Sequence, residues 1–593
     1  MLKKKRLECD LCVVGGGMAG MAAAISAARE GRKVVLMHER PVLGGNASSE
    51  IRMWICGAHG ENNRETGILE EIALENLYRT PTKNYPAWDS LLYDFVRRER
   101  NITLLLNCTC MEADVEEGEF PYGRGIAIKS VTGYQMTTQL FYEVAAKHYC
   151  DSSGDSILAP LTGADFRIGR ESDAEFGEQT NVKEPDRMTM GMSCLIQGRE
   201  TDEEIRYVAP DFATPLTAKD FEHRDPDIYN DSENFWYLEL GGTENTIDDT
   251  ESLRDRLVGL AAGTWDYVKN SGNFKAENWE LDFLGFLPGK RESRRMVGEY
   301  TVTQRDISDG RVFEDEIAFG GWPLDDHFPG GFYHRGAPNT YIPTPAPYSL
   351  PLRALYSKNV HNLWFAGRNI SMTHMAMSSI RVMATCALLG EAVGKAVAVA
   401  VENGIAANDV YLSHIKDVQA RLLREDCFLP SLRRNVSDAC KNAALTHADT
   451  LRNGEDRPHR IYGTSRATAA VHVEMGEEVR YAFAATEVEG VHIVFDSDLD
   501  RDTVPGTHAD RTHSTRANRR KGLPQMCLPP SLCRAFTLTG KTADGEEITL
   551  LSVAENCRRA YHVNVKKVLT SLTLTPTASW GDDTVPVISF DFA

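Results

Sequence analysis

The first forty residues alternate between short apolar runs and a glycine-rich turn. Residues 10–14 are apolar and predict a strand, and residues 18–29 have the alanine-rich composition of a buried helix. A second apolar run at residues 33–37 predicts another strand. The order strand, turn, helix, strand is typical of an α/β fold in which helices pack on a parallel sheet.

Apolar runs of strand length recur further along the chain. We predict strands at residues 102–106, 125–130 and 147–151, and another within residues 362–368 that ends in glycine. Polar turns, for example at residues 116–118, separate the first three and predict a small β-meander. Residues 379–401 predict a long, alanine-rich helix, whereas residues 160–350 are more polar and aromatic.

The pattern changes again toward the C-terminus. Residues 405–460 resemble connecting helices with charged faces. After residue 459, apolar and polar residues alternate in short runs. Examples are residues 478–483, 491–495, 572–577 and 587–592. Runs of this kind, separated by turns, predict an all-β sandwich.

The first turn carries a recognisable fingerprint, because residues 15–20 read Gly-Gly-Gly-Met-Ala-Gly. Gly15 permits a tight turn, Gly17 lets the backbone approach a pyrophosphate, and Gly20 lets helix and strand pack closely. The start of the helix offers free N–H groups and a partial positive charge to the phosphates. Glu39, about 20 residues further on, is placed to accept hydrogen bonds from ribose hydroxyls.

Composition narrows the function classes. The chain has 65 Lys and Arg against 85 Asp and Glu, a net charge of −20, so a nucleic acid or an anionic membrane is not expected as a partner. We find no apolar run of about 18 residues and expect no membrane span. The 13 cysteines are scattered, which suits reduced thiols, so we expect a cytoplasmic protein without a metal site.

The motifs together resemble the FAD-dependent oxidoreductases of the glutathione-reductase-like flavoprotein superfamily. The matching stretches are residues 13–20, 39–40, 44–45, 151–155, 163–165, 169–171, 366–368 and 378–381. More narrowly, the chain resembles the bacterial family that includes relatives of heterodisulfide reductase and of tricarballylate dehydrogenase. The cysteine clusters of the heterodisulfide reductase relatives are missing here, so an electron-bifurcating role is not expected.

The resemblance implies FAD as the cofactor. The expected cofactor-binding residues are Gly15, Gly17, Met18, Ala19, Gly20, Glu39, Arg40, Gly44, Gly45, Asn46, Asp151, Gly154, Gly367, Arg368, Ser378 and Arg381. We expect an α/β fold with a Rossmann-like FAD-binding domain. Its two parts are residues 1–158 and 351–404, around an inserted α+β substrate domain at 159–350. A helical connector at 405–460 and a β-sandwich at 461–593 follow, and this tail resembles galactose-binding-like sandwiches.

Four residues near these motifs are candidates for catalysis. His59 follows the glycine loop, and His374 follows the second flavin segment, so each is a candidate acid or base or a polar structural residue. Arg294 and Arg295 lie in the dense basic run at residues 289–295. Such arginines either grip an acidic substrate or the flavin, or form salt bridges with the protein's own carboxylates.

Three functions remain open from the sequence. The leading hypothesis is hydride transfer between flavin and a small polar metabolite with carbohydrate-like hydroxyls. The second is reduction or formation of a C=C bond in a carboxylic acid, and the third is a non-catalytic binding module with structural FAD. Because no second dinucleotide fingerprint is found, the other half-reaction is expected to use oxygen, a quinone, a carrier protein or the substrate itself. The sequence leaves homo-oligomerisation open and does not identify the electron partner.

Overall fold

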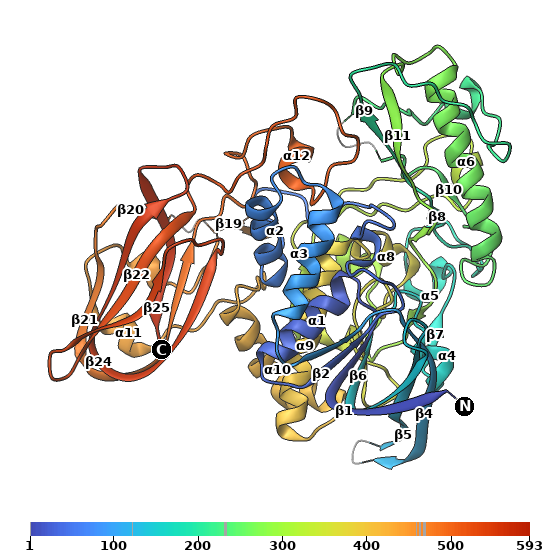
Figure 1. Ribbon diagram of the computed structural model, residues 1–593. Coiled ribbons are helices and arrows are strands. Elements are labelled where there is room, and N and C mark those ends of the chain that lie inside the picture. Colours follow the sequence, from blue (N-terminus) through green and yellow to red (C-terminus); the bar gives the residue numbers. More distant parts are fainter. Residues whose placement is uncertain (1, 121–122, 231–233, 458, 462–463, 467–469) are drawn as a thin grey trace.

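The computed structural model describes residues 2–120, 123–230, 234–457, 459–461, 464–466 and 470–593. A central α/β body carries an insert on one side, around helix α6 (Thr250–Asn270), and an antiparallel sheet on the other (Figure 1). The chain starts in the central body and ends in the antiparallel sheet.

The central body is built on a sheet that begins with parallel strands. Its strands are β1 (Lys3–Val14), β2 (Val34–Met37), β3 (Ile102–Leu105), β4 (Cys108–Phe120), β5 (Gly123–Gln135), β6 (Leu140–Asp151) and β16 (Leu363–Phe365). The order is β3-β2-β1-β6-β5-β4, and β16 also pairs with β6. The pairs from β3 to β6 and the β6–β16 pair are parallel, whereas β4, β5 and β6 form an antiparallel meander. The parallel α/β architecture predicted from the sequence is therefore present.

The strand register brings the carboxyl ends of four strands to one edge of the sheet. Val14 at the end of β1 pairs with Met37 at the end of β2 and with Asp151 at the end of β6. Phe365, the last residue of β16, pairs with Asp151 as well. The segments that follow these strands contain most of the expected cofactor residues, and ligands of α/β sheets bind at this edge.

The helices that cover this sheet pack closely because the residues at their contact faces have small side chains. The helices of the central body are α1 (Met18–Arg29), α2 (Ile68–Arg79), α3 (Tyr85–Arg97), α8 (His374–Ile380) and α9 (Met383–Asn403). A Cβ atom at Gly390 of α9 would lie 2.0 Å from the Ala19 carbonyl oxygen of α1, so these two backbones touch. Helix α9 is apolar and long enough to cross a membrane, but 94% of its most apolar window is buried inside the protein, as in a core helix.

The insert combines short strands with one long helix and has its own core. Its elements are α4 (Leu158–Thr162), β7 (Phe166–Arg167), α5 (Asp173–Phe176), β8 (Met192–Ser193), β9 (Ile196–Glu200), β10 (Glu239–Leu240), α6, β11 (Trp279–Leu284), β12 (Gly289–Lys290), β13 (Arg295–Met296), α7 (Gln304–Ser308), β14 (Glu316–Gly320) and β15 (Tyr348–Pro351). Trp265 and Trp279 are fully buried in this core. The expected domain limits at residues 158, 350, 404 and 460 stay a prediction.

The C-terminal part forms an antiparallel sheet. Its elements and the connector before it are α10 (Ala407–Arg424), α11 (Asp438–Asn442), β17 (Ala444–Leu445), β18 (His459–Ile461), β19 (Thr464–Arg466), β20 (Val471–Glu474), β21 (Val479–Phe495), α12 (His508–Thr512), β22 (Cys533–Thr542), β23 (Glu547–Val553), β24 (Ala560–Ser579) and β25 (Thr584–Phe592). The sheet has the order β20-β25-β21-β24-β22-β23, with β17 also on β21. The sequence predicts the β character correctly, while the sandwich stays a prediction.

Three local predictions differ from the structure. The polar turn expected at residues 116–118 lies inside β4, because this exposed stretch is held by pairing with β5. The expected strands at 478–483 and 491–495 are two halves of the single strand β21. The long helix expected at 379–401 is divided into α8 and α9, because Val382 has extended backbone angles.

The segment that contains α12 leaves the C-terminal part and lies against the central body (Figure 1). The Asn76 side-chain amide of α2 donates to the Ser514 carbonyl at 2.7 Å. The Lys83 ammonium, just after α2, donates to the Asp510 and His513 carbonyls. The C-terminal part is thereby joined to the same helix that follows the glycine loops.

Candidate functional site

Two of the three fingerprint glycines are required by the protein's own packing. Gly15 has φ of +108°, and a Cβ there would lie 2.3 Å from the Ser152 carbonyl oxygen. A Cβ at Gly20 would lie 1.9 Å from the Gly15 carbonyl oxygen. Side chains at these positions would collide with backbone, so both glycines maintain the turn itself.

Gly17 is different, because the protein leaves space beside it. The nearest atom to a Cβ at this position is the Gly45 Cα, at 3.8 Å. Gly17 is also the N-cap of α1 and no side chain caps the helix, so the first-turn N–H groups at Met18 and Ala19 have no capping partner. A small residue with free N–H groups at a helix start is the cradle that a pyrophosphate occupies. The residues present therefore fit a dinucleotide.

The loop after β2 lies directly on the glycine turn. The Gly44 N–H donates to the Gly16 carbonyl at 2.9 Å. A Cβ at Gly45 would lie 3.0 Å from the Gly17 Cα, so no larger residue fits without displacement. Asn46 donates from its side-chain amide to the Lys290 carbonyl at 3.2 Å, which ties this loop to the insert. The expected cofactor residues of the two loops are thus brought together.

Glu39 and Arg40 lie at the end of β2. The Glu39 side chain is 45% exposed, and its carboxylate lies 3.3 Å from His38 Nδ1 and 3.6 Å from the Arg40 guanidinium. Burial alone would raise the pKa of Glu39, but the Arg40 guanidinium is among the neighbours that hold it below its usual value. An ionised, accessible carboxylate here is able to accept from ribose hydroxyls.

His38 is a residue that sequence reasoning missed. Its Nδ1 accepts from the Gly16 N–H at 3.0 Å, and the ring is 1% exposed. The imidazole therefore maintains the shape of the glycine turn from the neighbouring strand. The only signal in the sequence was its position just before Glu39, where the fingerprint prescribes no residue type.

The Asp151 carboxylate lies at the end of β6 and makes hydrogen bonds inside the protein. Its carboxylate is buried and accepts from the Ser153 and Leu158 N–H groups at 3.0 and 2.8 Å, and from the Asn369 side chain at 3.2 Å. These donors occupy both oxygens of the Asp151 carboxylate. The Asp151 side chain maintains the turn between β6 and α4, and the expectation that Asp151 takes part in cofactor binding stays a prediction.

The segments around Gly154 and Gly367 meet at one arginine. Gly367 has φ of +120°, and the adjacent Arg368 donates to Asp155 at 2.8 Å and to the Ser293 hydroxyl at 3.2 Å. A Cβ at Gly154 would lie 3.1 Å from this guanidinium. The Arg368 charge is therefore balanced by Asp155. The guanidinium joins the segments that follow β6 and β16 to the insert.

Ser378 and Arg381 lie where α8 ends and α9 begins. The Ser378 hydroxyl is buried and donates to the Met375 carbonyl at 2.7 Å within its own helix. The expected contact of Ser378 with the cofactor stays a prediction. Arg381 lies 3.2 Å from an Asp325 carboxylate oxygen. Its Nε is buried without a partner among the described residues, so Arg381 keeps a free donor at the start of α9.

His374 is the centre of a buried ionic cluster. Its two ring nitrogens lie 2.8 Å from Glu292 and 3.0 Å from Asp326. Burial by itself would lower the pKa of His374, but the two carboxylates raise it to about 10. The ring is therefore an imidazolium at neutral pH, with both N–H groups engaged. This geometry suits electrostatic positioning and excludes a free general base at neutral pH.

The arginines of the basic run form salt bridges inside the protein. Arg295 is fully buried and paired with Glu171, at 2.7 Å, and with Glu292. Arg294 donates to the Asp155 carbonyl at 3.1 Å and lies over the Phe166 ring at 5.5 Å. The hypothesis that Arg295 grips a substrate is corrected, because its guanidinium has no exposed surface. The sequence left two roles open for these arginines, binding of an acidic ligand or internal salt bridges. Arg295 has the second role.

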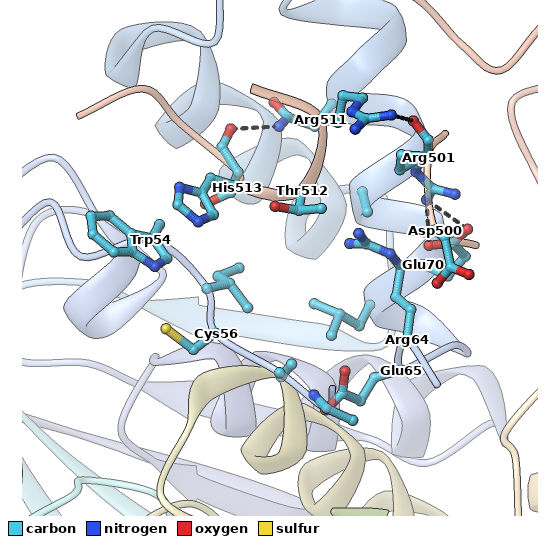
Figure 2. A pocket seen from close by; sticks show the side chains of 18 of the residues that line it. Trp54, Cys56, Arg64, Glu65, Glu70, Asp500, Arg501, Arg511, Thr512 and His513 are labelled. Carbon is cyan, nitrogen blue, oxygen red and sulfur yellow. Dashed lines mark hydrogen bonds and ion pairs between the residues drawn. The ribbon is translucent and has the colours of Figure 1, made fainter. Parts of the chain in front are cut away.

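A cavity of about 750 Å³ lies between residues 54–77 and residues 500–514. Trp54, Cys56, Arg64 and Glu65 line it from the central body, and Thr512 and His513 line it from the C-terminal part (Figure 2). Its size is within the range of small-molecule sites. Ala384, in the first turn of α9, also lines it, so the cavity adjoins the segments expected to hold the flavin.

His59 lines this cavity and is held by two aromatic residues. Its Nδ1 lies 3.2 Å from the Tyr341 hydroxyl, and its ring packs edge-on against Trp322 with centroids 4.7 Å apart. Burial lowers the pKa of His59 below its usual 6.5. The imidazole is consequently neutral near pH 7. Burial raises the pKa of the neighbouring Cys56 to about 12, so that residue is a thiol rather than a thiolate.

The cavity residues of the C-terminal part were not foreseen. Asp500, Arg501 and His513 contact α2 and the loop before it, although about 430 residues separate the two segments. The sequence of residues 498–502 is densely charged, but it contains no motif that indicates a binding site. Only the three-dimensional arrangement identifies it.

The sheet topology and the pyrophosphate cradle define a dinucleotide-binding flavoprotein fold. The profile of the family described as "FAD dependent oxidoreductase" matches residues 10–422, and the chain belongs to this family. It is therefore an enzyme, and its cofactor is FAD. The hypothesis of a non-catalytic binding module is not kept.

Similarity to individual proteins is local or distant. A stretch of 38 residues is 58% identical to fumarate reductase (cytochrome) from Shewanella frigidimarina, but it spans 6% of this chain and 7% of that protein. A geranylgeranyl bacteriochlorophyll reductase-like protein from Thermoplasma acidophilum is 12% identical over 71% of this chain and 85% of its own, with a TM-score of 0.30. The family 32 carbohydrate-binding module from Streptococcus pneumoniae EndoD is 13% identical over 26% of this chain and 99% of its own, with a TM-score of 0.17. At these TM-scores, neither structure identifies a substrate.

Proposed function

We propose that this enzyme oxidises a small polar metabolite that carries a hydroxyl group, bound in the 750 Å³ cavity. The observation that carries the proposal is the position of His59. It is a neutral imidazole in the cavity wall, held in place by Tyr341 and Trp322. FAD, when bound, supplies the hydride acceptor of such a reaction.

The chain's own contribution is proton transfer and orientation. We assign the Nδ1–H of His59 as a donor to the Tyr341 hydroxyl, which leaves the lone pair of Nε2 free to act as a base. Nε2 then accepts the hydroxyl proton as the hydride leaves the carbon atom. Trp322, packed edge-on, restricts rotation of the ring.

His374 supports this chemistry from a distance. As a buried imidazolium between Glu292 and Asp326, it fixes the N-terminus of α8. The backbone N–H of His374 also donates to Glu171 at 2.9 Å. We assign His374 a positioning role and reserve the base for His59.

A second candidate function is reduction of a C=C bond beside a carboxylate. It is favoured by Arg64, whose guanidinium lines the same cavity and forms no ion pair within 4.0 Å among the described residues. The two functions differ in how the substrate changes the oxidation state of the flavin. A hydroxyl compound reduces the oxidised flavin, whereas an unsaturated acid oxidises the reduced flavin.

The experiment is anaerobic mixing of the holoenzyme with sugars, polyols, hydroxy acids and unsaturated acids. We expect a hydroxyl compound to bleach the visible flavin band of the wild type. His59→Asn is expected to slow bleaching by about 10²–10⁴-fold, the usual contribution of a general base, while FAD stays bound. His414→Asn, on the exposed surface of α10, is the matched control. Bleaching by a hydroxyl compound at the wild-type rate in His59→Asn contradicts the assignment.

For the C-terminal sheet we propose a packing role rather than sugar binding. The buried Arg559, just before β24, supports this, because its Nε donates to the Asp426 carboxylate at 3.1 Å across the junction with the α10 connector. Deleting residues 461–593 should therefore destabilise the flavin domain rather than leave it intact. A cytoplasmic location remains a proposal from composition.

A further inference from the structure

Arg64 brings an unpaired guanidinium into the cavity. Its Nε donates to the Leu499 carbonyl at 2.6 Å, and its two terminal nitrogens have no partner among the residues that the structure describes. The other two arginines of the cavity are neutralised. Arg501 pairs with Glu70 at 2.7 Å, and Arg511 lies 3.4 Å from Asp502. Arg64 is therefore the arginine of this cavity that has no direct ion-pair partner among the described residues, while Glu70, Glu65 and Asp500 act on its charge from beyond 4.0 Å.

The nearby carboxylates are engaged elsewhere. Glu65 accepts from the Ala58 N–H at 2.9 Å, and Asp500 accepts from the Asn62 N–H at 3.1 Å. Burial, with Arg501 nearby, lowers the pKa of Arg64 to about 10, so its side chain is still charged at neutral pH. A buried guanidinium with no anion in direct contact is costly, which favours an anionic ligand at its free terminal nitrogens.

Part of the remaining lining is aromatic or apolar, beside polar and charged residues of both segments. The Trp54 ring stacks on His513 with centroids 4.5 Å apart and an interplanar angle of 5°. Leu69 and Ile72 of α2 line the cavity on another side. Figure 2 shows Trp54 and Arg64 on separate sides of one open space, below Thr512. Such a space suits a molecule with a carbon skeleton and one charged end.

We propose that the cavity binds a small organic carboxylate, with the terminal nitrogens of Arg64 holding the carboxylate and the Trp54 side receiving the carbon skeleton. This inference rests on the proposed function in one respect: it names the substrate class of the same cavity, a hydroxy acid or sugar acid. The segment of residues 500–514 closes the site, so the C-terminal part completes it.

A single carboxylate fits better than a phosphate. The two N–H groups of one arginine end match the two oxygens of a carboxylate. A doubly charged phosphate would call for further free cations, but the Lys83 ammonium is engaged by the Asp510 and His513 carbonyls. Arg501 and Arg511 are already paired.

The test measures binding without turnover. Oxidised holoenzyme is titrated by calorimetry with benzoate and glutarate, and with their neutral amides benzamide and glutaramide. None of these compounds has a hydroxyl to oxidise. We expect the acids to bind at least about tenfold more tightly than the amides. Arg64→Gln should weaken the acids by about 10–100-fold and leave the amides unchanged.

Two further variants keep the test decisive. Arg64→Lys retains the charge without the paired donors and should give intermediate affinity, which covers the case in which Arg64→Gln folds poorly. Arg433→Gln, whose ion pair with Glu455 lies outside the cavity, is the control and should bind like the wild type. Equal binding of acids and amides, no acid binding at all, or unchanged acid binding in Arg64→Gln would overturn the proposal.

The outcome is separable from that of the proposed function. If acids bind through Arg64 but no hydroxyl compound reduces the flavin, the site stands and the proposed oxidation fails. If a neutral sugar reduces the flavin through His59 while Arg64→Gln changes nothing, the function stands and the carboxylate proposal fails.

Discussion

The Nη2 of Arg501 donates to both carboxylate oxygens of Glu70, each at 2.7 Å. The two side chains are 1% and 2% exposed. Glu70 belongs to α2 and Arg501 to the segment after β21, so this contact joins one wall of the cavity to the segment that closes it. Ser497 adds a hydrogen bond to Glu70 at 2.8 Å.

Removing one member of this pair should be costly. Glu70→Gln leaves the Arg501 charge buried without its partner, and we expect a loss of about 3–5 kcal/mol in the free energy of unfolding. Asp502→Asn, which removes the exposed partner of Arg511, should cost no more than about 1 kcal/mol. Urea unfolding followed by circular dichroism measures both. Equal, small effects would show that the Arg501–Glu70 pair does not join the two parts.

The empty space beside Gly17 gives a prediction about the cofactor. Gly17→Ala places a Cβ where the pyrophosphate approaches but 3.8 Å from the nearest protein atom, so the apoprotein should fold normally and bind FAD at least about tenfold more weakly. Gly20→Ala should fail to fold, because its Cβ would lie 1.9 Å from the Gly15 carbonyl oxygen. The ratio of flavin to protein absorbance after dialysis against FAD, with the unfolding midpoint of the apoprotein, distinguishes the two. Wild-type FAD affinity in Gly17→Ala would place the pyrophosphate elsewhere.

The pH dependence of the reaction follows from His59. A base is active when neutral, and burial lowers the pKa of His59 below 6.5. The value of kcat/KM should therefore rise with pH through that pKa and be level above about pH 6.5. His59→Asn should lose this acid limb together with most of the rate. An acid limb that persists in His59→Asn belongs to another group.

Stability should depend on pH through His374. Its folded pKa of about 10 lies above the usual 6.5, so the ionic cluster stabilises the fold fully below pH 6.5 and loses this stabilisation as pH rises toward 10. The difference in unfolding free energy between the wild type and His374→Asn should narrow over that interval. Both proteins contain the same distant titratable groups, so the contributions of these groups cancel in the difference. A difference that is constant from pH 6 to pH 10 would mean that His374 is not charged in the folded protein.

Local elements were predictable where the sequence pattern determines them. Helix α1 spans Met18–Arg29 as expected, because its small apolar residues are suited only to a helix buried in the core. The glycine turn at residues 15–20 has the expected form, since Gly15 and Gly20 are dictated by backbone contacts. In contrast, β1 begins at Lys3 rather than at residue 10, because pairing with β6 extends it through polar, exposed residues.

The site was less predictable because ion pairs and cavities join distant segments. The sequence showed the arginine run but not that Glu171 and Glu292 surround Arg295. It indicated His59 as a candidate without showing that residues 500–514 would form the opposite wall of its cavity. Charge density alone does not reveal which arginine remains unpaired, and Arg64 was therefore missed.

The most direct test of the central claim is the visible spectrum of the purified holoenzyme during anaerobic addition of hydroxy acids and sugar acids. We predict the bands of oxidised flavin at the start and their bleaching by one compound of this class, at a rate that depends on His59. A protein that shows no flavin bands and takes up no added FAD would contradict the cofactor assignment. A bound flavin that stays oxidised with every hydroxyl compound would contradict the proposed oxidation.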